Sequence, residues 1–227
     1  MTHDVNDNLN RKKLSAEKKM SIEHERITTA YHESGHTICA LSNYIMIYSI
    51  AIFFNKNSKK KDLGFTHCEY LDYTEEKYSD ELVRAVVESE IIMNYGGLAA
   101  EKLLYKDICG NSKIPMVMKY GSHYDTDKIA ELISKYNLAP PGKTRSLYKK
   151  RLLSETQDLL EDLWLDVKLI SHALIDRKKL FTYDLKEILT TDSENKTYWK
   201  SKFKDLENLY YKPNTCDADY LAKCLLK

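Results

Sequence analysis

Residues 30–38 read Ala-Tyr-His-Glu-Ser-Gly-His-Thr-Ile and contain the pattern His-Glu-x-x-His. In a helix, His32 and His36 lie one turn apart on the same face, where two imidazoles can bind one zinc ion. Glu33 points in a neighbouring direction and can reach a water molecule at the metal as a general base. The pattern therefore predicts a hydrolytic zinc site on a helix.

The residues around this motif predict that its helix is largely buried. Apolar side chains recur at helical spacing on both sides of it: Ile27, Ala30, Tyr31, Ile38 and Leu41. A buried helix has little reason to carry two histidines and a glutamate unless a partner satisfies them. The alternative, two surface histidines on an ordinary helix, fits this pattern less well. We expect the helix to begin near Ser15 or Ser21, which are both suitable N-caps, and to end at about Leu41.

The composition is that of an ordinary globular protein with little net charge. Hydrophobic residues make up 43% and charged residues 30% of the 227 residues, and the formal net charge is +1, so nothing favours a nucleic-acid partner. Only seven glycines and four prolines are present, which favours long helices over a turn-rich sheet protein. The predicted fold class is mainly α with a small β element (α+β).

The cysteines and the apolar stretches indicate where the protein works. The number of cysteines, five, is odd, and no pair has the spacing Cys-x-x-Cys. Both features are typical of a reduced, cytoplasmic protein. The N-terminus is polar and lacks the apolar core of a signal peptide. The most apolar stretch, residues 38–54, contains polar residues and is shorter than the about 20 residues that a membrane span needs. We therefore expect a cytoplasmic protein without a membrane span.

Periodicity and chain breakers place the remaining elements. We expect strands over residues 45–54 and 63–68 with a lysine-rich connector over 56–62, helices over 78–105, 125–136, 147–174 and 183–189, and a loop over 109–122. The pair Gly96-Gly97 interrupts the pattern of the first of these helices, and close helix packing is expected there because glycine otherwise lowers helix stability. Gly64 within a strand predicts either the close approach of another backbone or a bulge.

A hydrolytic zinc site usually has three protein ligands and a water molecule, so one ligand must come from outside the motif. The candidates by residue type are Glu101, His123, Asp125 and Asp127, and spacing alone does not choose among them. For Glu101 the stronger interpretation is a carboxylate that supports the site without binding the metal. For His123 it is a histidine on a surface loop.

Four blocks in order resemble the zinc peptidase domain of the FtsH-type AAA proteases. They are His-Glu-Ser-Gly-His at 32–36, Leu-Gly-Phe-Thr at 63–66, Gly-Gly-Leu-Ala-Ala-Glu at 96–101 and Gly-Ser-His-Tyr-Asp at 121–125. In that family the blocks read approximately His-Glu-x-Gly-His, Leu-Gly-Tyr-Thr, Gly-Gly-Arg-x-Ala-Glu and Gly-Ala-Ser-Asn-Asp. The resemblance covers about residues 27–189. It implies that His32, His36 and Asp125 bind zinc and that Glu33 is the catalytic base.

The resemblance also implies a substrate and a reaction. In the related peptidases the strand that here contains Gly64, Phe65 and Thr66 borders the cleft and pairs with extended substrate. The implied function is a zinc-dependent endopeptidase that hydrolyses extended or unfolded polypeptides. The alternative is a catalytically silent domain of the same fold that binds a partner or regulates a larger protease. The complete set of ligands together with Glu33 argues against that alternative.

Two departures from the family pattern concern substrate and subunit contacts rather than the ligands. Leu98 replaces the arginine of the glycine block, and His123-Tyr124 replaces Ser-Asn before Asp125. The ATPase module and the membrane anchor of the family have no counterpart in the sequence, so we expect a stand-alone peptidase that does not use ATP by itself. Self-association and a separate ATPase are then the partners to test, besides the polypeptide substrate. We expect a flexible polar arm over residues 1–20, the peptidase domain over 21–190 and a C-terminal extension packed on it over 191–227.

Overall fold

The computed structural model describes residues 3–53, 64–70, 78–110, 122–211 and 218–226 of the chain. In chain order the elements are α1 (His3–Ser42), β1 (Met46–Ile52), β2 (Gly64–Glu69), α2 (Asp80–Cys109), α3 (Ser122–Lys135), α4 (Lys143–Asp162), α5 (Trp164–Arg177), β3 (Lys179–Phe181), α6 (Thr182–Thr191), α7 (Lys196–Tyr211) and α8 (Ala218–Leu225). The described residues thus form a mainly α structure with one small antiparallel sheet, which confirms the predicted fold class.

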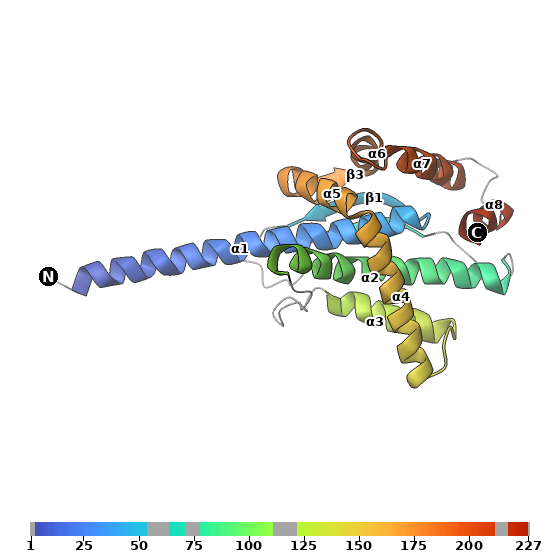
Figure 1. The fold of residues 1–227 in the computed structure, drawn as a ribbon, viewed down its shortest axis with the longest axis horizontal. Coiled ribbons are helices and arrows are strands. Elements are labelled where there is room, and N and C mark those ends of the chain that lie inside the picture. Colours follow the sequence, from blue (N-terminus) through green and yellow to red (C-terminus); the bar gives the residue numbers. More distant parts are fainter. Residues whose placement is uncertain (1–2, 54–63, 71–77, 111–121, 212–217, 227) are drawn as a thin grey trace.

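Helix α1 is the longest element and organises the others. Its C-terminal half lies among the remaining helices and the sheet, while its N-terminal part extends away from them (Figure 1). The helix begins at His3, so the predicted start near Ser15 or Ser21 is wrong, and residues 3–20 are helical where the sequence predicted a flexible arm. No glycine or proline precedes Ser21 in the sequence. Nothing in the local sequence therefore stops the helix from continuing beyond its packed part.

Helix α2 packs along α1 at a point where two glycines meet. A Cβ atom on Gly35 would lie 2.3 Å from the Gly96 carbonyl oxygen, and one on Gly96 would lie 2.5 Å from the Gly35 carbonyl oxygen. Such distances are far below van der Waals contact, so this crossing requires glycine on both helices. The predicted close packing is confirmed. Although the glycine pair interrupts the apolar pattern, α2 continues through it without a break, as the single helix predicted over residues 78–105 requires.

The sheet has the strand order β2-β1-β3, and both pairs are antiparallel. The central strand β1 packs on α1, and a bulge between Ile47 and Ser49 shifts its register with β2. Strand β2 is an edge strand of this sheet, and its alternate residues Gly64 and Thr66 face α1, where they meet Glu33. The short strand β3 was not predicted, because three residues give too little periodicity to detect.

The single helix predicted over residues 147–174 is two helices. The chain turns at the buried Leu163, between α4 and α5. Helix α4 packs mainly on α2, whereas α5 packs mainly on α1. A straight helix could not pack its two halves on these two different partners, so tertiary packing overrides the continuous helical pattern. Helix α3 begins at Ser122, slightly before its predicted start, and also packs on α2.

Helix α7 lies beside α6 on the sheet side of the molecule, and α8 packs on α2 (Figure 1). Trp199 and Phe203 of α7 and Leu221 of α8 belong to the hydrophobic core. The predicted lysine-rich connector, 56–62, falls outside the described residues, as does most of the predicted loop over 109–122. None of the helices in the described ranges combines the length and apolarity that crossing a membrane requires.

Candidate metal centre

The two histidines of the motif are buried on the face of α1 that meets α2. His32 is 8% and His36 is 7% exposed. The Nδ1 atom of His32 lies 2.6 Å from Glu101 Oε1, and the Nδ1 atom of His36 lies 2.7 Å from the carbonyl oxygen of Met93. A carboxylate and a peptide carbonyl can only accept, so each Nδ1 carries the proton and donates it. In the neutral imidazoles the free lone pair is therefore on Nε2, which is the arrangement of metal-binding histidines.

Asp125, in the first turn of α3, completes a cluster with these lone pairs. Its Oδ2 atom lies 3.3 Å from His32 Nε2 and 3.5 Å from His36 Nε2, and the two Nε2 atoms are 2.9 Å apart. Among the described residues, His32, His36 and Asp125 form a group whose ligand atoms all lie within 4.8 Å of one another.

The donor set fits a cation. Asp125 Oδ2 is buried without a hydrogen-bond partner in the described structure, and it faces two imidazole nitrogens. With neutral imidazoles, three lone pairs converge on one point and no proton lies between them. Buried polar atoms are rarely left in this state, so a positive charge is required to satisfy the cluster. Two imidazoles and one carboxylate are the ligands of many catalytic zinc sites.

The pKa values of the cluster show the same demand for positive charge. Burial lowers the pKa of His32, but Asp125 and Glu101 raise it by more, so the net pKa lies well above the usual histidine value. Burial raises the pKa of Asp125, but His32 and His36 lower it by more, so the carboxyl stays ionised far below its usual range. Both shifts favour a positive charge beside the ionised Asp125 carboxylate, where a metal ion would satisfy the same groups.

Gly97 of α2 leaves the space that the imidazoles occupy. A Cβ atom there would lie 2.5 Å from His32 Nε2 and 2.6 Å from His36 Nε2. Of the two adjacent glycines, Gly96 therefore allows the helices to cross and Gly97 allows the histidine rings to fit. The sequence showed the pair as an unusual feature of a helix, but it did not show that the second glycine faces the site.

Glu33 faces strand β2 rather than the interior of the cluster. Its Oε2 atom accepts a hydrogen bond of 2.7 Å from the Thr66 hydroxyl, and the side chain is 6% exposed. A Cβ atom on Gly64 would lie 2.6 Å from Glu33 Oε1. The close approach predicted at Gly64 is thus made by the Glu33 side chain and not by another backbone. Phe65, which lies between Gly64 and Thr66, is partly exposed on the other face of the strand.

The remaining candidates lie outside the cluster. Glu101 touches the Nδ1 side of His32, where it orients the ring and cannot share a metal ion with Nε2. His123 and Asp127 are exposed on α3. The Met93 carbonyl, which holds His36, could not be found from the sequence because every residue carries the same group.

The chain is similar in sequence to a known zinc metalloprotease. No protein-family model matches the chain. Over 151 residues the chain is 27% identical to the ATP-dependent zinc metalloprotease FtsH 1 of Rhodopirellula baltica, and the aligned region covers 62% of this chain. The chain spans 21% of the length of that protein. The similarity supports a relation to the FtsH zinc metalloproteases.

Proposed function

We propose that this chain is a zinc-dependent endopeptidase that hydrolyses extended or unfolded polypeptides. The observation that supports this most strongly is the convergence of His32 Nε2, His36 Nε2 and the orphaned Asp125 Oδ2, beside a buried glutamate that faces an edge strand. The similarity to a zinc metalloprotease supports the same reaction class.

The residues of the site have separate roles in the proposed reaction. His32, His36 and Asp125 would hold zinc, which when bound supplies Lewis-acid chemistry that polarises a carbonyl and acidifies water. Glu33 accepts a proton from the attacking water and returns it to the leaving amine. The Thr66 hydroxyl orients the Glu33 carboxylate, and Glu101 and the Met93 carbonyl fix the two imidazoles in the correct tautomer.

The edge strand β2 supplies the surface for the substrate. Among the described elements only β1 pairs with β2, so the opposite edge offers main-chain donors and acceptors to an added strand. An extended polypeptide can bind there by β-augmentation, close to Glu33 because Gly64 and Thr66 meet this side chain. A folded protein cannot present such a strand, which is why the proposed substrates are extended or unfolded chains.

The test is a paired digest of a stable folded domain and its permanently unfolded variant, with metal analysis of the same preparation. We expect one zinc per chain, cleavage of the unfolded substrate only, loss of cleavage with a chelator and no effect of ATP with magnesium. Absence of zinc and of cleavage would refute the proposal. Cleavage of the folded domain only after addition of a cell extract would indicate a separate ATPase partner.

A further inference from the structure

Helix α7 makes polar contacts with the turn before β1 and with the last residue of β2. The hydroxyl of Tyr210 donates toward two carbonyl oxygens, that of Tyr44 at 3.2 Å and that of Glu69 at 3.1 Å. Tyr44 lies in the turn before β1, and Glu69 is the last residue of β2. One side chain of the C-terminal extension thus joins the start of one strand to the end of its neighbour.

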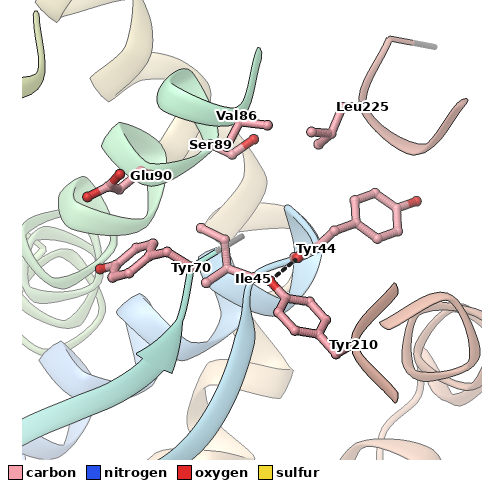
Figure 2. A pocket seen from close by; sticks show the side chains of 8 residues that line it. All are labelled: Tyr44, Ile45, Tyr70, Val86, Ser89, Glu90, Tyr210 and Leu225. Atoms are coloured by element: carbon pink, nitrogen blue, oxygen red, sulfur yellow. Dashed lines mark hydrogen bonds between the residues drawn. The ribbon is translucent and has the colours of Figure 1, made fainter. Parts of the chain in front are cut away.

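Tyr210 contacts the strand pair at the end beyond its bulge. Met46 and Glu69 form its last residue pair, and the bulge between Ile47 and Ser49 separates this end from the regular part of the ladder. A small pocket lies at the same place, between the strand ends, α2 and the C-terminal helices (Figure 2). In that view the Tyr210 ring reaches across toward Tyr44, and Ile45 lies beside it. The Tyr210 hydroxyl thus contacts two main-chain carbonyls at the border of this pocket.

A second residue of α7 holds the end of α1. Lys202 Nζ donates to the Ser42 carbonyl oxygen at 2.7 Å and lies 3.5 Å from the centroid of the Tyr44 ring. A cation at this position satisfies a free carbonyl at the helix C-terminus and complements the helix dipole. Helix α7 therefore fixes the end of α1 and the end of β2 relative to each other.

We propose that Tyr210 is a positioning residue that holds the edge strand β2 in register for an incoming polypeptide, so that α7 sets the affinity for substrate. This inference rests on the proposed function, because β2 carries Thr66 and Gly64 beside Glu33. Tyr210 contacts β2 at Glu69, three residues after Thr66, and Thr66 has its own hydrogen bond to Glu33. Loss of the Tyr210 hydroxyl should therefore weaken substrate binding more than it slows the chemical step.

The substitution Tyr210→Phe tests this, with Tyr211→Phe as the matched control, since Tyr211 is the next residue on the helix and is 58% exposed. We expect Tyr210→Phe to raise KM for an unfolded substrate by roughly two- to tenfold, the range of one net hydrogen bond. The kcat value and the zinc content should match those of the control. Hydrogen exchange should be faster at the ends of β1 and β2 in Tyr210→Phe alone.

Two further outcomes separate this inference from the proposed function. Equal KM and equal strand exchange in the two variants, or a loss of kcat at unchanged KM, would overturn the positioning role. Absence of turnover in the unmutated chain would refute the proposed function. In that case the Kd of a fluorescent extended peptide decides: weaker binding by Tyr210→Phe than by Tyr211→Phe supports the positioning role, and equal binding overturns it.

Discussion

Two buried aspartates of this protein have opposite surroundings. Asp166 of α5 is fully buried, and its two oxygens accept hydrogen bonds from the Ser193 hydroxyl, the Asn195 side-chain amide and the Trp199 indole. Asp125 of α3 is 8% exposed, and its Oδ2 atom faces two imidazole nitrogens without a hydrogen-bond partner.

The difference shows how a buried carboxylate reveals its role. Three donors satisfy the charge of Asp166: Ser193 and Asn195 precede α7 and Trp199 lies in its first turn, so this aspartate fastens the start of α7 to α5. Next to neutral imidazoles Asp125 meets acceptors instead of donors, and such an arrangement calls for a positive charge at the cluster. The first aspartate is satisfied by donors within the chain, whereas the second is suited to bind a cation.

The largest effect that we predict concerns the glutamate beside the Asp125 cluster. Glu33→Gln should lower the rate of hydrolysis by about 10²- to 10⁴-fold, the usual contribution of a general base, because the amide cannot accept the proton. Zinc content should stay at the wild-type value because Glu33 does not face the cluster. Peptide hydrolysis assays and metal analysis on the same sample check this, and near-normal hydrolysis would contradict the role of Glu33.

The second prediction sharpens the difference between holding a metal and orienting its ligands. Glu101→Ala removes the acceptor for His32 Nδ1 and should weaken zinc affinity by about 10- to 100-fold without abolishing it. The measurement is a competitive titration with a chromophoric chelator, with Glu25→Ala, at an exposed position of α1, as the control. Complete loss of zinc in Glu101→Ala, with retention in Asp125→Ala, would make Glu101 the ligand.

The third prediction concerns Asp166, the buried aspartate whose charge is satisfied by donors. Asp166→Asn places an amide nitrogen among three donors and should reduce the free energy of unfolding by about 1–3 kcal/mol. Zinc binding should be unchanged, because the altered network lies on α5 and α7. Denaturant unfolding measures the first effect and metal analysis the second. A protein of normal stability would show that the network does not fasten α7.

The smallest effect is expected at the strand that faces Glu33. Thr66→Val keeps the shape of the side chain but removes the hydroxyl that donates to Glu33 Oε2, and should reduce kcat by roughly two- to tenfold. Ser49→Ala, at a buried position of β1, is a suitable control for loss of a hydroxyl from the sheet. An equal change in both variants would indicate a general effect on the sheet and not an effect on Glu33.

The sequence was sufficient to predict those parts of the structure that local patterns determine. The spacing of His32 and His36 predicted their common face, and the composition predicted a mainly helical fold. The break at Leu163 was not predictable, because it depends on α4 and α5 packing on different helices. The support of His36 by the Met93 carbonyl was not predictable either, since backbone atoms leave no trace in the sequence.

The third ligand candidate shows where the limit lies for the site. Four acidic or histidine side chains were available by type, and only the fold brings one carboxylate of α3 within 3.5 Å of both Nε2 atoms. Gly97 illustrates the same limit, because its proximity to both histidine rings depends on how α1 crosses α2. Residues whose role depends on a neighbouring element are found by structure, even when the sequence marks them as unusual.

The most direct test is the zinc content of three variants and the unmutated protein, measured side by side. We predict one zinc per chain in the unmutated protein and in Asp166→Asn, and none in Asp125→Ala or His36→Ala, with all four proteins folded by circular dichroism. Zinc retained at full occupancy in folded Asp125→Ala would contradict the account, because the orphaned carboxylate would then not be what holds the metal.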